Sequence, residues 1–266
     1  MKNFLLVLFT VLSTAFLLFG YSYYQERTNI SSLANSEAET GSTANLASKE
    51  EPVKEETETD ISQLVSNWPE EAQQNFLDAV EAGEVYKVAI VGSQAMGTGE
   101  NGWSEQLQAG LTATYGEGLE IELFEYDTTS IEFINSPDSQ EVIDFSPDMV
   151  LFEPFSLNDN SGGVAPSDNH VSIEMFQSSL LGANEEASLI LQPTHPLYGA
   201  TYYPIQVEDL QQFAEEMDIT YLNHWQAWPD TDDETLEDYL SSSKEEPSEQ
   251  GHEVWADFLL DYFIAE

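Results

Sequence analysis

Apolar residues beyond residue 60 alternate between short continuous runs and stripes at helical spacing. Runs of about four to eight residues, bounded by glycine or polar residues, are typical of buried strands. The sequence predicts five such strands, over 86–91, 119–126, 149–152, 188–191 and 219–222. The last apolar stripe, from Val254 to Phe263, lies on one face of a predicted closing amphipathic helix.

Helical patterns fill the stretches between these strands. Trp68-Pro69-Glu70-Glu71 has proline and acidic residues where they favour a helix start, and Gly83 favours its end. Helices are predicted over 61–84, from 103 to 116 or 118, and over 173–181, 207–217 and 235–240. Strands that alternate with helices imply βαβ crossovers and a mainly parallel sheet covered on both faces.

The first sixty residues have a different pattern. Phe4–Phe19 carries no charge, follows Lys2 and extends through aromatic residues to Tyr24, which is close to the length of a spanning helix. No small-x-small cleavage site follows, and no cysteine is present to take a lipid. Residues 1–24 are therefore predicted to be an uncleaved signal anchor rather than a cleaved signal peptide. The positive-inside rule then makes this a single-pass protein of the cell membrane, with its C-terminal part on the extracytoplasmic side.

Residues 25–60 consist mainly of Ser, Thr, Asn, Ala and Glu. With almost no apolar surface to bury, they cannot offset their conformational entropy, and we predict a disordered acidic linker. The remaining stretch, 61–266, is long enough for one sizeable core.

The net charge of the chain limits the classes of molecule that it can bind. The chain has 6 Lys and Arg against 50 Asp and Glu, a formal net charge of −44, and beyond residue 60 only Lys87 and Lys244 are basic in this count. Such a surface repels nucleic acid, anionic lipid and anionic wall polymers, and it predicts adaptation to high salt or alkaline medium. The absence of cysteine excludes disulfides and thiol catalysis and favours a bacterial surface.

Polar side chains follow each predicted strand, at the edge where parallel sheets bind ligands. They supply hydroxyl, amide, carboxylate and imidazole groups and lie at 92–94, 127–130, 153, 156–159, 192–195 and 223–224. This set suits acyl transfer or the binding of a polyol. It contains no cationic clamp for a phosphate and no Cys or His pair at metal spacing, so no cofactor and no metal are predicted.

The order of these features resembles the SGNH/GDSL hydrolases, a family of esterases, lipases and carbohydrate O-deacetylases. The resemblance spans roughly residue 87 to the C-terminus. It rests on the first strand running into Gly92-Ser93, the helix at Trp103, the block 156–159, which looks like G-x-N-D, and the segment 247–252, which looks like the end of H-P-N-x-x-G-H. It implies a flavodoxin-like three-layer α/β sandwich around a mainly parallel five-stranded sheet.

The resemblance also implies a catalytic set. In this family a serine after the first strand attacks the ester, an asparagine helps to stabilise the oxyanion, and a histidine ahead of a proline is the base. Asn158 matches the asparagine. The usual G-D-S order places Gln94 at the nucleophile, so Ser93 takes that role only if the turn is shifted by one residue. Glu246 and Ser243 occupy the positions of the histidine and its aspartate.

Three histidines remain as candidate bases. His252 matches the family's second histidine, which is usually a structural residue on the closing helix. His195 and His224 follow the fourth and fifth strands and could replace the lost base. The predicted site is Ser93, Asn158 and His252, with His195 and His224 as alternatives for the base.

Two functions follow from these residues. One is a cell-surface ester hydrolase, an esterase or carbohydrate O-deacetylase, with Ser93 as nucleophile. The other is a catalytically inactive member of the same fold that binds an envelope glycan or a partner protein. The residues at Gln94, Ser243 and Glu246 favour the second function. The hydrolytic activity usual for this fold favours the first.

Overall fold

The computed structural model describes residues 61–99, 101–244 and 246–265. In these residues five parallel strands form one sheet in the order β2-β1-β3-β4-β5. The strands are β1 (Tyr86–Gly92), β2 (Leu119–Glu125), β3 (Met149–Phe152), β4 (Ser188–Leu191) and β5 (Thr220–Tyr221). All five predicted strands and the parallel α/β class are confirmed, and the strand order is the flavodoxin-like one.

Helices connect successive strands. The α-helices of the described residues are α2 (Ile61–Leu64), α3 (Glu70–Ala82), α4 (Trp103–Tyr115), α5 (Ser130–Asn135), α6 (Pro137–Asp144), α7 (Ser156–Gly162), α8 (Pro166–Ala183), α9 (Tyr203–Glu216) and α10 (Glu249–Phe263). Short 3₁₀ helices are η2 (Gln94–Met96), η3 (Gly116–Gly118), η4 (His224–Ala227) and η5 (Glu234–Tyr239).

The single helix predicted over 61–84 is wrong, because the chain breaks at Trp68-Pro69. Pro69 has φ −54° and ψ 141° and lies just before α3, so the helix begins at Glu70. A residue that precedes proline is disfavoured in the helical region, and the buried Trp68 ring is instead held by a 2.9 Å hydrogen bond from its Nε1 to the Phe263 carbonyl. Gly83 ends α3 with φ 70°, as predicted.

Other boundaries also differ from the sequence pattern. The helix predicted over 235–240 is the 3₁₀ helix η5, and the helices α5, α6 and α7 were not predicted. Each of these three is only six to eight residues long, which is too short to show a helical apolar stripe. α7 contains the G-x-N-D-like block, which therefore lies on a helix rather than in a loop.

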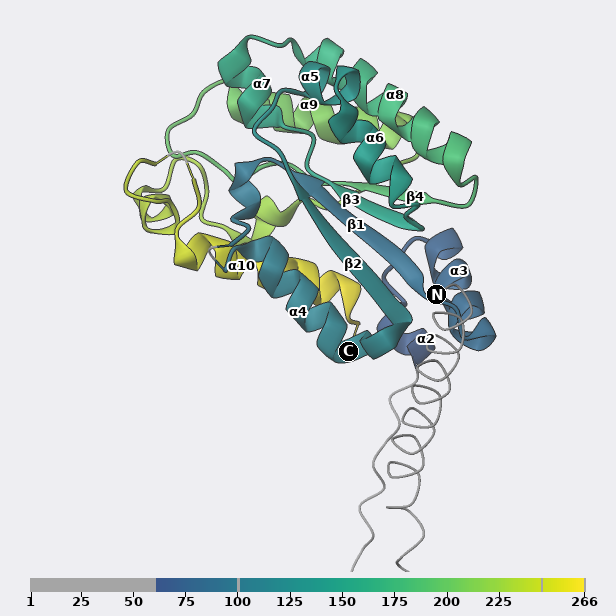
Figure 1. Ribbon diagram of the computed structural model, residues 1–266. Helices are drawn as coiled ribbons and strands as arrows, with labels where there is room; N and C mark the ends of the chain where they lie inside the picture. Colours follow the sequence, from purple (N-terminus) through teal and green to yellow (C-terminus); the bar gives the residue numbers. More distant parts are fainter. Residues whose placement is uncertain (1–60, 100, 245, 266) are drawn as a thin grey trace, which may run out of the picture. The chain divides into compact units, whose positions relative to one another are not determined.

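The sheet is buried between two helical layers (Figure 1). Helices α3, α4 and α10 contribute to the core on one face, where Val88 and Ile90 of β1 point. Helices α5, α6, α8 and α9 contribute to the core on the other face, where Ala89 and Val91 point. Consecutive residues of β1 thus enter opposite cores, which explains why this strand is a continuous apolar run in the sequence.

An aromatic stack fixes the closing helix against α4 and the loop after β5. The Trp255 ring stacks on Trp103 with 4.6 Å between ring centroids and on His224 with 4.0 Å. All three side chains are at most 1% exposed. The stack joins three segments that lie far apart in the sequence, close to the carboxyl ends of the strands.

The predicted anchor (1–24) and linker (25–60) lie outside the described residues. Among the residues that are described, no helix has both the length and the apolar character needed to cross a bilayer.

Candidate functional site

An open cavity of about 320 Å³ lies at the carboxyl ends of the strands. Its lining comes from the loop after β1, from α7, from the loop after β4 and from the segment before α10. The lining residues are Ser93, Gln94, Ala95, Leu157, Asn158, Ser161, Thr194, His195, Leu197, Lys244 and Glu246. The structure therefore brings Ser93 and Asn158, two of the three predicted site residues, into one cavity.

Ser93 is the first residue after β1 and the N-cap of η2. Its backbone N–H donates to Glu153 Oε2 at 2.8 Å, and its hydroxyl accepts from the Ala95 N–H at 3.4 Å. Ser93 is only 3% exposed, whereas Gln94 is exposed. At the floor of the cavity, Glu153 thus fixes the Ser93 backbone and the Ala95 N–H contacts its hydroxyl.

Glu153 lies beneath this turn, directly after β3, and is 1% exposed. The Thr194 hydroxyl donates to Oε1 of the same carboxyl group, so Glu153 connects the ends of β1, β3 and β4. Burial raises the pKa of Glu153, while hydrogen bonds from Thr194, Ser93 and the Ser156 backbone act in the opposite direction. A Cβ at Gly92 would lie 3.1 Å from Glu153 Cβ, so glycine leaves room for the carboxyl group.

Asn158 reaches the cavity from α7. Its Nδ2 donates to the Thr128 carbonyl at 2.8 Å, which leaves one of its two N–H groups for another acceptor. The neighbouring Asp159 fixes the helix, because it accepts from the Ser130 backbone at 2.7 Å, from the Ser130 hydroxyl at 2.6 Å and from Asn169 Nδ2 at 2.8 Å. The asparagine is therefore held in place by both backbone and side-chain contacts.

Of the candidate bases, only His195 lines the cavity. It is 1% exposed and lies on the loop after β4, between Pro193 and Pro196. Its neighbour Thr194 also lines the cavity and binds Glu153. His195 and Ser93 thus follow two strands, β4 and β1, that lie on either side of β3 at the same edge of the sheet.

His224 lies under the site and does not line the cavity. Its Nε2 bonds to the Pro193 carbonyl at 2.9 Å, and Trp228 Nε1 donates to its Nδ1 at 3.0 Å. Because indole is only a donor, Nδ1 must accept and the proton resides on Nε2. Burial lowers the pKa of His224 to about 3. Both ring nitrogens are committed, so this histidine is a neutral structural residue and not a base.

His252 lies on α10, outside the residues that line the cavity. Its Nδ1 accepts from the backbone N–H of Trp103, the first residue of α4, at 3.2 Å. A Cβ at Gly97 would lie 2.8 Å from His252 Cε1, so the ring packs closely against that turn. The structure thus places His252 as a cap on α4 and does not bring it together with Ser93 and Asn158.

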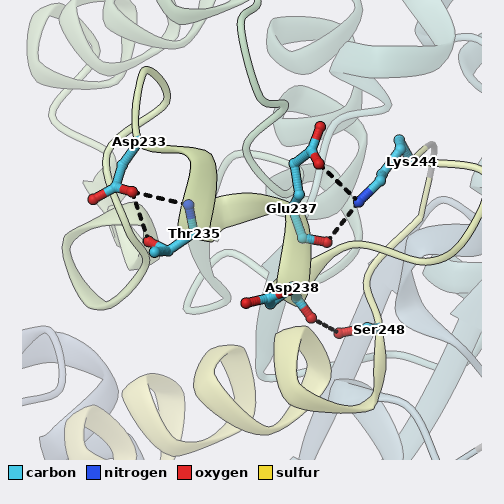
Figure 2. Close-up of polar contacts among 6 residues, drawn as sticks. All are labelled: Asp233, Thr235, Glu237, Asp238, Lys244 and Ser248. Carbon is cyan, nitrogen blue, oxygen red and sulfur yellow. Dashed lines mark hydrogen bonds and ion pairs between the residues drawn. The ribbon is translucent and has the colours of Figure 1, made fainter.

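Lys244 and Glu246, from the segment between η5 and α10, also line the cavity. Figure 2 shows the contacts of Lys244 and Ser248 with η5. Lys244 has φ 66°, and its Nζ donates to the Glu237 carbonyl at 2.8 Å and lies 3.6 Å from Glu237 Oε2. The Ser248 hydroxyl donates to the Asp238 carbonyl at 2.9 Å. These contacts attach the segment to η5.

No protein-family model and no curated protein sequence matches the chain. Solved structures do match. A lipolytic protein of the G-D-S-L family from Desulfitobacterium hafniense is 18% identical and aligns over 66% of this chain and 98% of its own, with a TM-score of 0.53. A catalytic mutant of an acetylxylan esterase from Geobacillus stearothermophilus is 18% identical over 67% and 94%, with a TM-score of 0.52. A psychrotrophic esterase from a Pseudoalteromonas species is 19% identical over 66% and 95%, with a TM-score of 0.52.

The chain has the SGNH/GDSL hydrolase fold. The resemblance read from the sequence is confirmed at this level. Gln94 and Glu246 both line the cavity. In the resemblance to the family these two residues occupy the positions of the nucleophile and of the catalytic histidine.

Sequence reasoning missed the role of Glu153 in this site. It appeared only as one polar residue at a strand end, since the burial of a carboxyl group cannot be read from the chain. Within the described residues no group of three or more His, Cys, Asp or Glu side chains could hold a metal ion.

Proposed function

We propose that this protein hydrolyses an ester, with Ser93 as nucleophile and His195 as general base. The observation that carries the proposal is that Ser93, Asn158 and His195 line the same cavity at the carboxyl edge of the sheet. A hydroxyl, an amide and an imidazole are the groups that acyl transfer requires. The fold shared with esterases supports this choice of reaction.

In the proposed reaction His195 accepts the Ser93 Oγ proton as the oxygen attacks the ester carbonyl carbon. The second N–H of Asn158 Nδ2 donates to the oxyanion that forms. When the ester C–O bond breaks, the departing alkoxide takes the proton from His195. A water molecule, deprotonated by the same imidazole, then hydrolyses the acyl-serine and restores Ser93.

The lining of the cavity supports a polar substrate. Ser93, Gln94, Asn158, Ser161 and Thr194 contribute hydroxyl or amide groups, against the apolar side chains of Ala95, Leu157 and Leu197. A long acyl chain would leave these polar groups without partners, whereas a short acyl group on a sugar would hydrogen-bond them. We therefore propose a carbohydrate ester with a short acyl group, a substrate class that the matching acetylxylan esterase also illustrates.

A second candidate function is binding without turnover. It is favoured by the hydrogen bond from the Ser93 N–H to Glu153, because that N–H faces away from any oxyanion. The exposed Gln94 at the family's nucleophile position favours it as well. In this case the same cavity holds an envelope glycan and no bond breaks.

Assays of the full chain on p-nitrophenyl acetate and on acetylated xylo-oligosaccharides separate the two candidates. Hydrolysis that disappears in Ser93→Ala supports the nucleophile. Ser179→Ala, which removes an exposed hydroxyl on α8 outside the cavity, is the matched control, and we expect it to retain turnover. Activity that survives Ser93→Ala, or wild-type protein without activity on any ester, refutes the hydrolase and leaves the binding function.

We propose further that residues 1–24 anchor the chain in the cell membrane with the catalytic domain outside. The uncharged run Phe4–Phe19 supports this. Fractionation of the cells that produce the protein is expected to find it at full length in the membrane. A soluble form that starts near residue 25 contradicts the anchor.

A further inference from the structure

A second concave surface, which we call the Trp225 groove, lies beside the cavity. It has a volume of about 470 Å³. Its apolar wall is formed by Pro196, Pro204, Val207, Trp225 and Pro229. The proposed reaction uses none of these residues, so the groove requires a separate explanation.

Trp225 differs from the other tryptophans of the chain. The chain has five, and Trp68, Trp103, Trp228 and Trp255 are between 0 and 6% exposed, whereas Trp225 is only partly buried. Its Nε1 donates to the Thr194 carbonyl at 2.7 Å, and the Tyr203 ring packs against it with 5.4 Å between ring centroids. The indole ring is therefore fixed before any ligand binds, which reduces the entropy lost on binding.

The polar residues of the groove surround this aromatic ring. Gln211 and Asn223 offer amides, and Glu208, Asp230 and Asp232 offer carboxylates. No Lys or Arg lines the groove, so an anionic ligand would meet only negative charge. An apolar ring face next to amide and carboxylate groups matches a neutral sugar, which has an apolar face and a rim of hydroxyl groups.

We propose that the Trp225 groove binds a neutral sugar unit of the glycan that carries the ester. This inference rests on the proposed function, which it extends from an ester bond to a polymer. The groove and the cavity share the loop after β4: His195 and Leu197 line the cavity, and Pro196 between them lines the groove. The Gly199 N–H donates to the Thr231 carbonyl at 2.8 Å and joins this loop to the segment that forms the far wall. An oligosaccharide can therefore occupy the groove while a neighbouring unit enters the cavity.

The test measures binding separately from turnover. The full chain with Ser93→Ala is titrated by calorimetry with xylohexaose and with N-acetylchitohexaose as neutral probes, and with hexagalacturonate and spermidine as anionic and cationic probes. We expect a neutral hexasaccharide to bind and both charged probes to fail. Trp225→Ala should weaken that binding by about tenfold, the loss expected for one aromatic contact.

Further variants separate stacking from folding. Trp225→Phe keeps an aromatic face but loses the hydrogen bond to Thr194, and it should retain most of the affinity. Tyr202→Ala removes an aromatic side chain that is 76% exposed and does not line the groove, and it should bind like the parent. Circular dichroism melting of each variant confirms folding.

Three results overturn the proposal. The first is that no neutral hexasaccharide binds at about 10 mM, tenfold above a millimolar Kd. The others are that Trp225→Ala binds as tightly as the parent, or that spermidine binds in preference to the sugars. Failure of the proposed function has a different signature. In that case the wild-type chain cleaves no ester but still binds the hexasaccharide through Trp225.

Discussion

The backbone N–H of Ser93 donates to Glu153 Oε2 at 2.8 Å, across the ends of two adjacent parallel strands. The second oxygen of the same carboxyl group accepts from the Thr194 hydroxyl. One buried side chain therefore sets the position of the proposed nucleophile and of the residue next to the proposed base. The cavity floor is built as a unit around Glu153.

Two substitutions of Glu153 are expected to show how much its hydrogen bonds, as distinct from its negative charge, contribute to stability. Glu153→Ala leaves the Ser93 N–H and the Thr194 hydroxyl buried without an acceptor, and it should lower the free energy of unfolding by about 2–4 kcal/mol. Glu153→Gln keeps an oxygen for Ser93 and an amide that donates to Thr194, so its cost should be within about 1 kcal/mol. Urea denaturation measures both. Equal stability of the two variants would show that the carboxyl group does not organise the floor.

The raised pKa of Glu153 predicts a pH dependence. The folded state holds this proton at pH values where the unfolded chain has released it. The stability conferred by protonation is therefore present at low pH and is lost as pH rises from the ordinary carboxyl pKa through the raised one. Glu153→Gln has no such proton, so the difference in melting temperature between it and the wild type should change over that window. A constant difference at all pH values contradicts the assignment.

His224 is expected to make the stability of the protein depend on pH in the opposite direction. Its pKa is about 3 in the folded protein and about 6.5 when unfolded. The unfolded state therefore binds the extra proton between these values, and stability is lost as pH falls below about 6.5. By this linkage the loss at pH 5 is about 2 kcal/mol. His224→Gln, which stays neutral, should lose less stability than the wild type between pH 7 and pH 5. A parallel decline in both proteins would disprove the linkage.

The sheet and the site differ in how far the sequence predicts them. β1 is apolar at consecutive positions because Ala89 and Ile90 enter opposite cores, and that pattern is visible in the chain. The start of α5 was also readable, since Thr129 and Glu132 form a capping box at the spacing such boxes require, yet it was missed.

The three candidate histidines show why the site could not be predicted fully. His195 and His224 follow strands and His252 lies on the closing helix, and none of these positions shows from the sequence which ring faces the nucleophile. Only packing separates them: one lines the cavity, one has both nitrogens bound in the core, and one caps α4. Tertiary contacts, which leave no local signal, decide their chemistry.

These positions lead to a prediction that compares two histidines. If the protein is an ester hydrolase, His195→Asn should lower kcat by roughly 10²–10⁴, the usual contribution of a general base, with little change in melting temperature. His252→Asn should leave kcat within about threefold and lower stability by about 1 kcal/mol, the usual cost of a lost helix cap. Kinetics on p-nitrophenyl acetate and thermal melts measure the pair. The reverse pattern would make His252 the base.

Asn158 should contribute to the rate rather than to the fold. Removing one oxyanion donor typically lowers kcat by about 10²–10³, so Asn158→Ala is expected to lose that much while KM changes little. Asn158→Asp, which keeps the size but has no N–H to donate, should lose at least as much. If Asn158→Ala raises KM and leaves kcat unchanged, the amide binds the ground state only.

The acidic surface predicts a response to salt. Lys87 and Lys244 are the only Lys or Arg beyond residue 60, and within the described residues each already pairs with a glutamate, at 3.7 Å from Glu120 and 3.6 Å from Glu237. The other carboxylates therefore repel one another with few local cations to balance them.

Added NaCl shortens the Debye length from about 30 Å at 0.01 M to about 3 Å at 1 M, so the repulsion should fade over this range. The melting temperature should rise with NaCl, most steeply below about 0.1 M, where the Debye length changes most. Sucrose at matched osmolality is the control for general exclusion effects, and a melting temperature that stays flat from low to molar NaCl would contradict the prediction.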